Sequence, residues 1–498
     1  LCLCPSLCVC LCLCLCLSLC PCVCVCVCVC VCVSTMFPGF RVWSRQGCAA
    51  PKVYRARLLT CLQDEATLQY LEDGIVAVDS QGVITEVCAY DGRAVDEDFR
   101  PAILMPSFVD AHIHYPQLRI HGAATGPLLE WLATSTFPEE ARYEDEEHAR
   151  RHARCFLAAM VSAGTTQAMV YGSCHASATD ILMQEAQSLG IRLIAGPVLM
   201  DTNCPENLIV PPEEALGGLQ DLVEKWHGQM DGRLQVAVVP RFALTCTEKM
   251  MKAAGEMARK HDLWVTTHLS ENVQECEVAL SMFPDCSDYL EIYEKMGLVS
   301  RKSAYAHCIY LSEDEMQRLA RQGAVVVHCP DSNVFLGSGK MVLQKLRKHQ
   351  ATLAFGSDVA GGRSYRMNHI ASVAYDVSLQ VQLEAKLSGA TEEELESTSY
   401  VPMHGDLLWS ITRGGAQALL NDQIGVLAPG FEADMVVMEV PEWADSLKDA
   451  LGYLFFDHDA PRPLHVFVKG QQVWDRREWA AKTGGGYPWA PEAAASSS

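Results

Sequence analysis

The chain has 498 residues, with 39 Lys and Arg against 61 Asp and Glu, and therefore a formal net charge of −22. Such an acidic protein repels phosphate backbones and anionic lipid surfaces, so we expect neither nucleic acid nor membrane as a partner. With 49% hydrophobic and 20% charged residues, the chain is not intrinsically disordered. Its length suits about three domains, or one large barrel with an accessory part.

The first 33 residues alternate Leu or Val with Cys and hold more than half of the 25 cysteines. A translated GT dinucleotide repeat encodes such Val-Cys alternation, and Met36 begins an ordinary sequence. We interpret residues 1–35 as an artefact of a gene model and leave them out of the fold; a membrane anchor is the alternative. The other cysteines, from Cys48 to Cys329, form no CxxC pairs, which indicates reduced thiols and a cytoplasmic location.

Both ends of the remaining chain show short strands separated by turns. Strands are predicted around Ser80-Gln81-Gly82 and again at Asp434–Val440 and Val466–Val473. We expect residues 36–101 and 421–480 to form one small β-sandwich domain. Residues 481–498, rich in Gly, Pro, Ala and Ser, are expected to be a disordered tail.

Residues 102–420 alternate short apolar runs with longer charged stretches, which is typical of a parallel sheet covered by helices. The expected strands are Ile103–His114, Thr165–Tyr171, Arg192–Met200, Leu234–Arg241, Leu263–Leu269, Ser303–Cys308, Ala324–Pro330 and Ala351–Asp358. The expected helices include Glu139–Met160, Glu248–His261 and Ser312–Gln322, the last with a capping box. Eight strands close a (β/α)8 barrel, so the predicted fold class is α/β, a TIM-like barrel with a terminal β-sandwich.

Polar residues follow several strands at the end where barrel enzymes place their active sites. His112 and His114 end the first strand on one face, His268 ends the fifth, His307 the sixth and Asp358 the eighth. Each alone could be an ordinary half-buried polar group, but their coincidence at one end of a barrel indicates a site. Three imidazoles and one carboxylate suit Zn²⁺ or Fe²⁺, with His112, His114, His268 and Asp358 as ligands.

Hydrolytic chemistry requires a group that moves protons beside the metal. Glu271, three residues after His268, is the expected proton carrier, while His307 would hydrogen-bond the water or the tetrahedral centre. Asp358 would also orient the attacking water. The fourth strand ends in Arg241, which cannot bridge two metals because it stays protonated, so we expect a single metal. Arg241 is instead a candidate contact for a substrate carbonyl, with a structural ion pair as the alternative.

Two further motifs have both chemical and structural interpretations. Gln117, three residues after His114, could donate to and accept from an amide-like ring edge, or be an ordinary loop residue. His328-Cys329-Pro330 contains metal-ligand residue types, but we expect a structural role at the end of the seventh strand.

From about residue 60 to 475 the sequence resembles the amidohydrolase superfamily and, more closely, the guanine deaminases. The HxH motif and the final Asp358 are marks of the superfamily. The closer resemblance rests on Met105–His114, Leu128–Leu132 with Thr136-Phe137-Pro138, Pro240-Arg241-Phe242, His268–Asn272, His328-Cys329-Pro330 with Ser332-Asn333, and Gly356–Gly362.

This resemblance implies hydrolysis of guanine to xanthine and ammonia, a step of purine catabolism, in a cytosolic homodimer. It implies one zinc per chain on the four ligands given above. Catalytic roles fall to Glu271, His307 and Asp358. The implied substrate-binding residues are His114, Gln117, Arg241, Phe242, His268, Glu271 and Asp358.

Two positions depart from the family pattern, and two other functions stay open. Ser107 stands where Gly is common and could distort a turn, and Asp331 stands where Asn is common.

The alternative functions are those of another mononuclear deaminase, acting on adenine, cytosine or triazine rings, and of a non-catalytic scaffold or cytoskeletal partner. A cation at Arg241 favours a ring carbonyl over an adenine amino group, and scaffold relatives typically lose ligands that this chain keeps. The HxE…PCxxC signature of cytidine deaminases is absent from the sequence.

Overall fold

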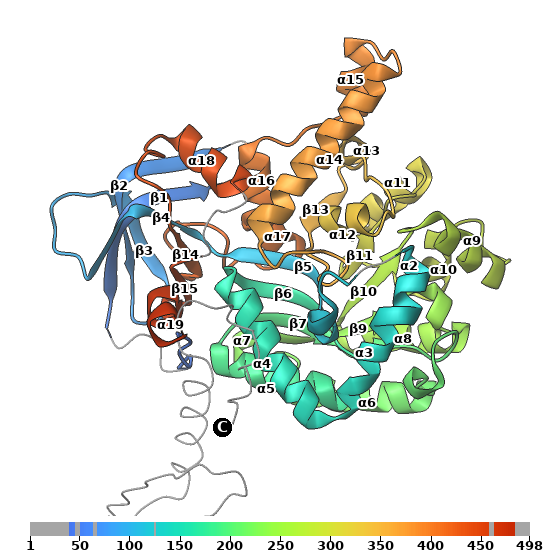
Figure 1. The fold of residues 1–498 in the computed structure, drawn as a ribbon. Coiled ribbons are helices and arrows are strands. Elements are labelled where there is room, and N and C mark those ends of the chain that lie inside the picture. The colour runs from blue at the N-terminus through green and yellow to red at the C-terminus, as the bar shows by residue number, and fades with distance from the viewer. Residues whose placement is uncertain (1–38, 45–49, 63–66, 124–125, 458–462, 484–498) are drawn as a thin grey trace, which may run out of the picture.

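The computed structural model describes residues 39–44, 50–62, 67–123, 126–457 and 463–483, and Figure 1 shows a sheet beside a helix-covered barrel. The tract 1–35 and nearly all of the expected tail lie outside the described residues, although 481–483 end a helix. Within these described ranges, no helix is both long and apolar enough to cross a membrane.

Eight parallel strands form the barrel, in the order β5-β6-β7-β9-β10-β11-β12-β13, with the short β8 paired to β9. The eight strands are β5 (Phe108–His114), β6 (Thr165–Tyr171), β7 (Arg192–Gly196), β9 (Leu234–Pro240), β10 (Trp264–Leu269), β11 (Ser303–His307), β12 (Val325–His328) and β13 (Thr352–Phe355), and β8 is Val198–Leu199. The last strand returns to the first, because the Asp358 N–H donates to the His112 carbonyl at 2.8 Å. The predicted fold class is therefore confirmed, and strands such as β6 are buried along their whole length, as a helix-covered sheet requires.

Helices cover the outside of the barrel between the strands, while α15 (Glu392–Thr398) projects away from it (Figure 1). The others are α4 (Glu146–Ser162), α5 (Ala176–Leu189), α6 (Pro212–Trp226), α7 (Gln229–Gly232), α8 (Glu248–His261), α9 (Val273–Met282), α10 (Tyr289–Lys295), α11 (Glu313–Gln322), α13 (Leu343–Lys348), α14 (Met367–Leu387), α16 (His404–Ile411) and α17 (Arg413–Ala418). The predicted capping box is present, since Ser312 Oγ accepts from the Glu315 N–H and Glu315 Oε2 accepts from the Ser312 N–H.

Short helical segments follow several strand ends. They are η1 (Tyr115–Ile120), α2 (Leu128–Trp131), η2 (Leu132–Thr136), α3 (Phe137–Glu140), η3 (Ala141–Glu144), η4 (Glu206–Leu208), η5 (Ala243–Thr245) and α12 (Pro330–Phe335). Among them, η1, α2, η2, α3 and α12 carry residues of the site or their partners. The helix expected over 139–160 begins only at Glu146, because the Asp145 side chain caps it by accepting from the Glu147 and His148 N–H groups.

The second sheet has seven strands in the order β16-β15-β14-β4-β1-β2-β3, taken from both ends of the chain. They are β1 (Lys52–Cys61), β2 (Leu68–Val78), β3 (Ile84–Ala89), β4 (Glu97–Pro106), β14 (Met435–Met438), β15 (His465–Val468) and β16 (Gln471–Asp475), with α18 (Leu447–Phe456) and α19 (Arg476–Thr483) beside them. All neighbouring pairs are antiparallel except β1 with β4. The domain boundaries at 101/102 and 420/421 stay a prediction.

The expected strand Ile103–His114 is divided at Ser107 into β4 of the accessory sheet and β5 of the barrel. The cause is the pairing of two successive amides. The Ser107 N–H donates to the Asp434 carbonyl at 3.0 Å, and the Phe108 N–H donates to the Gly164 carbonyl at 2.9 Å, so the chain changes sheets there. Ser107 does not adopt a positive φ, so the serine fits this junction without the distortion that we considered.

Candidate active site

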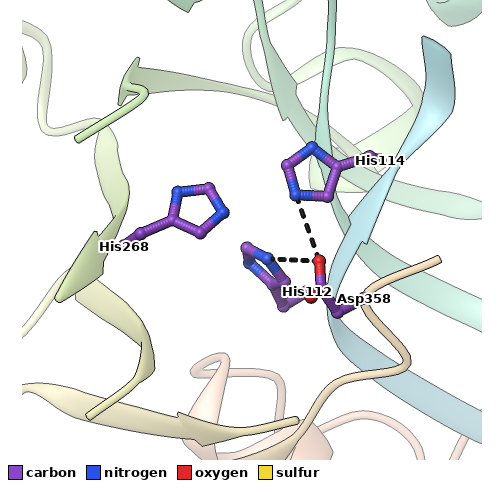
Figure 2. Close-up of side chains that lie close together, drawn as sticks. All are labelled: His112, His114, His268 and Asp358. Carbon is purple, nitrogen blue, oxygen red and sulfur yellow. Dashed lines mark ion pairs between the residues drawn. The ribbon is translucent and has the colours of Figure 1, made fainter. Parts of the chain in front are cut away.

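The four expected metal ligands converge at the carboxyl ends of the barrel strands. His112 and His114 come from β5, His268 from β10, and Asp358 follows β13, and Figure 2 shows their side chains turned toward one another. Their possible ligand atoms lie within 4.8 Å of one another. Asp358 Oδ1 lies 3.1 Å from His112 Nε2 and 3.2 Å from His114 Nε2. The fold therefore gathers onto one point residues that are up to 246 positions apart in the chain.

The state of the donor atoms fits a metal cation. In the described part of the chain, both ring nitrogens of His112 and Nδ1 of His114 are buried without a hydrogen-bond partner. His268 Nδ1 lies 2.6 Å from the Arg241 carbonyl oxygen, so it donates there and leaves Nε2 for a ligand role. Burial lowers the pKa of His112, of His268 and, to about 4, of His114. Neutral imidazoles with free lone pairs are what Zn²⁺ binds.

Asp358 supplies the negative charge of this group. Burial alone would raise its pKa, but the neighbouring His112 and His114 outweigh burial and hold that pKa well below its usual range. A permanently ionised carboxylate beside neutral imidazoles is the donor set of a hydrolytic zinc site.

A second group of possible ligand atoms, His112, His307 and Cys329, shares His112 with the first. Burial raises the pKa of the Cys329 thiol well above its usual value, and a neutral thiol is a poor metal ligand. His307 Nδ1 is held 2.8 Å from Asn333 Oδ1, which orients its ring. These contacts agree with a structural role for the segment around Cys329, which stays a prediction.

Glu271 is placed to carry a proton. Its side chain is buried, and burial together with the nearby Asp358 charge raises its pKa to about 8. Glu271 Oε1 accepts from Ser338 Oγ at 2.9 Å, and Oε2 lies 3.4 Å from His307 Nε2. A carboxyl whose pKa lies near neutrality can both accept and release a proton during a reaction.

The backbone around these groups is strained. His307 has φ 74° and Asp358 has φ 48°, both in the left-handed region that non-glycine residues rarely adopt. Such strain is concentrated at functional sites, where the surrounding structure enforces it. Gly361 is required for space, since a Cβ there would lie 2.9 Å from Asp358 Oδ2 and 2.6 Å from Ser332 Oγ.

A small cavity opens beside the metal-binding group. Its lining comprises His114, Gln117, Leu128, Trp131, Leu132, Arg241, Phe242, His268, Glu271, His307, Leu336 and Asp358. Every residue that we assigned to substrate binding therefore lies on one cavity, while His112 lies outside its lining. The apolar wall from Leu128, Trp131 and Leu132 belongs to a motif that we used for the resemblance without deriving its role.

Sequence reasoning missed the carboxylate behind two of these residues. Glu140, at the end of α3, accepts from Arg241 Nη1 at 2.6 Å and from Gln117 Nε2 at 3.1 Å. Arg241 thus forms the buried ion pair that was its structural interpretation, and it also lines the cavity, while its contact with a substrate carbonyl stays a prediction. Glu140 lies two residues after the Thr136-Phe137-Pro138 segment, but only the packing of α3 against the barrel shows its partners.

The departure at Asp331 also has a structural reason. Asp331 accepts from the Arg363 backbone N–H at 2.5 Å and from Arg363 Nε at 3.0 Å, and it thereby anchors the loop that follows Asp358. Burial opposes ionisation here, but His369 and Arg363 outweigh it and lower the pKa of Asp331 to about 2.

Comparison with known proteins agrees with this geometry. The sequence model of the Amidohydrolase family matches residues 103–473. Guanine deaminase from Escherichia coli (strain K12) is 36% identical over 429 residues, which cover 82% of this chain and 93% of that protein. The crystal structure of guanine deaminase from Bradyrhizobium japonicum, 32% identical, superposes with a TM-score of 0.80 over 86% of this chain and 99% of that chain. An adenosine deaminase from Xanthomonas campestris with bound zinc, 25% identical, superposes with a TM-score of 0.72 over 86% of this chain and 93% of that chain. The chain therefore belongs to the amidohydrolase family and, within it, to the guanine deaminases.

Proposed function

We propose that this protein hydrolyses guanine to xanthine and ammonia with one zinc ion per chain, held by His112, His114, His268 and Asp358. One observation carries the proposal: a single small cavity joins this metal-binding group to a cation, an amide and a protonatable carboxyl. Guanine presents a ring carbonyl, ring N–H groups and an amidine carbon, and these match that set of partners. The guanine deaminases among the relatives support the choice of substrate.

The zinc ion supplies a Lewis acid that lowers the pKa of a water molecule toward about 7 when it is bound at this site. Glu271 accepts a proton from the attacking water and delivers it to the purine ring as the water oxygen bonds to C2. His307, whose Nδ1–H donates to Asn333 Oδ1, presents Nε2 to the attacking water and accepts a hydrogen bond from it. Glu271 then takes the second proton of the water oxygen and passes it to the amino group, so that the C2=O bond forms as the C2–N bond breaks and ammonia leaves.

The other pocket residues bind and orient the ring. Arg241 donates to the ring carbonyl, and Gln117 faces the amide-like edge of the ring. Phe242 and the apolar wall exclude water from the ring faces, which strengthens each of these hydrogen bonds. In this proposal the protein is a cytoplasmic homodimer of purine catabolism.

The decisive experiment is an absorbance assay of the full chain with guanine, scored for xanthine and ammonia, beside a metal analysis. We expect turnover with about one zinc per chain. Zinc without guanine turnover would retain the deaminase chemistry and reopen the substrate, so adenine, cytosine and triazines would be assayed next. A folded protein with neither zinc nor turnover would contradict the proposal and favour a scaffold.

A further inference from the structure

One buried carboxylate near the cavity has no part in the chemical steps above. Glu140 is fully buried and does not line the cavity, yet it contacts two residues that do. Its Oε2 accepts from Arg241 Nη1 at 2.6 Å, and its Oε1 accepts from Gln117 Nε2 at 3.1 Å. Phe137, in the same turn of α3, places its ring centroid 5.2 Å from the guanidinium carbon of Arg241.

We propose that Glu140 is a positioning residue that sets both the orientation and the charge of the purine-binding edge. It holds Arg241 and Gln117 in their binding orientations, and it balances the charge of Arg241 so that the pocket prefers neutral purines to purine anions. This inference rests on the proposed function, which it extends to the selection of ligand charge.

The orientation of Gln117 follows from contacts at both ends of its amide. A carboxylate only accepts, so Glu140 can bind only the NH₂ end of this amide. The Ala360 N–H only donates, and it donates to Gln117 Oε1 at 3.2 Å. The amide therefore has one orientation, in which one N–H and one lone pair stay available to a ligand. Without Glu140, the Ala360 N–H would be the one partner left, among the described residues, to select this orientation.

The charge balance follows from burial. The Arg241 side chain is 3% exposed and that of Glu140 is 0% exposed, so water screens neither group. Arginine keeps its proton even when buried, and loss of Glu140 would therefore leave an uncompensated cation beside the ligand. Such a pocket would bind anions more tightly. Xanthine, with two ring carbonyls, ionises more readily than guanine, so Glu140 would also favour release of the product.

The preceding residue offers a matched control. Glu139 is also buried and lies in the same helical turn, but it accepts from Arg119 Nη1 and Arg142 Nη1, both at 3.2 Å. These arginines are about half exposed and do not line the cavity. Glu139→Gln therefore removes a buried carboxylate from α3 without touching Arg241 or Gln117.

The test compares steady-state kinetics of the zinc-loaded full chain with those of its Glu140→Gln and Glu139→Gln variants. Arg241 and Gln117 donate to different oxygens of Glu140, and glutamine replaces one of these oxygens with an NH₂ group that cannot accept. We therefore expect the KM for guanine to rise at least about tenfold in Glu140→Gln, with a smaller change in kcat. Zinc content should stay at the wild-type value, and Glu139→Gln should leave KM unchanged. Equal KM values in Glu140→Gln and wild type, or equal losses in both variants, would overturn the proposal.

Xanthine inhibition measures the charge effect separately. At a pH where xanthine is largely anionic and guanine is neutral, xanthine should inhibit Glu140→Gln more strongly than wild type, while guanine binds more weakly. A merely structural defect would weaken both ligands together. Parallel weakening would therefore contradict the assigned control of charge.

Glu140→Gln could unfold because it strands a buried cation, and the double variant Glu140→Gln/Arg241→Gln removes that hazard. Because Glu140 acts in part through Arg241, its loss should raise the KM less in the Arg241→Gln background than in the wild type, and the remaining rise comes through Gln117. Fully additive losses would refute this coupling. A wild-type protein without guanine turnover would count against the proposed function instead. A crystal structure of either Glu140 variant then decides the positioning role, because an unmoved Gln117 amide would overturn it for any substrate.

Discussion

The two ends of the barrel each contain a buried arginine–carboxylate cluster, and the two clusters differ in how completely their polar atoms are paired. At the end away from the site, Arg192 of β7 binds both Asp434 and Glu432 of the accessory sheet. Lys469 completes this cluster, because its backbone N–H donates to Asp434 Oδ1 at 2.8 Å and its Nζ lies 3.0 Å from Glu432 Oε1. These charges satisfy one another and join the two sheets.

At the site end, Arg241 and Glu140 are paired, but the imidazoles beside them are not. Within the described residues, nitrogens of His112, His114 and His307 are buried without hydrogen-bond partners. Buried polar groups without partners destabilise a fold, so their presence in one cluster indicates that a ligand completes them. The paired cluster thus joins the two sheets, whereas the imidazole nitrogens without hydrogen-bond partners lie at the end of the barrel that carries the candidate site.

The largest expected effect comes from removing a ligand at the incompletely paired end. His112→Ala should abolish zinc binding and lower kcat/KM more than about 10⁴-fold, because the activation of water is lost. Its metal-free form should also lose stability, because the contact between His112 Nε2 and Asp358 Oδ1 at 3.1 Å is lost while Asp358 stays buried. Metal analysis, kinetics and denaturation of the metal-free protein check this, with His152→Ala on α4 as the control. Stoichiometric zinc in His112→Ala would show that the ligand set is wrong.

Glu271→Gln should separate metal binding from proton transfer. We expect full zinc content with turnover reduced about 10²–10⁴-fold, since an amide cannot accept and pass on the proton. Parallel metal analysis and kinetics measure the two effects, and Glu277→Gln, exposed on α9, serves as the control. Wild-type turnover in Glu271→Gln would remove Glu271 from the mechanism.

At the completely paired end, Arg192→Ala should affect stability rather than catalysis. It leaves the Asp434 carboxylate buried without its cation, which typically costs about 3–5 kcal/mol of the free energy of unfolding. Turnover per folded molecule should stay at the wild-type value. Denaturant unfolding and kinetics measure these quantities, with Arg150→Ala as the control. Arg150 forms a partly exposed pair with Glu185, so its loss should cost at most about 1 kcal/mol. Equal losses of unfolding free energy in the two variants would contradict the distinction between the two ends of the barrel.

Asp331 adds a paired carboxylate at the site end of the barrel to this comparison, because its oxygens bind Arg363. Its pKa falls from 3.8 to about 2 on folding, so its ionised form stabilises the fold above the unfolded pKa, and this stability is lost as pH falls through the folded pKa. Asp331→Asn should therefore lower the free energy of unfolding by about 2 kcal/mol near neutral pH. The difference in free energy of unfolding between Asp331→Asn and the wild type should decrease below about pH 4. Denaturant unfolding across this pH range checks it, and a pH-independent difference would contradict the linkage.

Local sequence patterns determined much of the fold. β6 and α8 have the bounds that their apolar periodicity predicts, and Ser312 with Glu315 forms the expected capping box. Periodicity could not locate the division at Ser107, because the apolar pattern continues through it. Only the acceptors at Asp434 and Gly164, which come from different sheets, decide where one sheet ends and the other begins.

The candidate site, like the fold, could be predicted only in part from the sequence. Spacing and strand position place His112, His114, His268, Glu271 and Asp358 at one end of the barrel before any coordinates are known, because parallel strands share their carboxyl ends. The hydrogen-bond partners of the site residues were not predictable from the sequence. Asn333, Ser338 and Glu140 reach His307, Glu271 and Arg241 across 26, 67 and 101 positions of the chain.

The sequence by itself therefore determined which chemical groups the site contains and at which end of the barrel they stand, since both follow from residue type and strand periodicity. Tertiary structure alone decided which buried groups are paired and which stay open to a ligand. Pairing depends on side chains brought within hydrogen-bond distance from separate elements, and no local pattern encodes that distance. Glu140 is the clearest case, because its carboxylate acquires a function only where α3 packs beside Arg241 and Gln117.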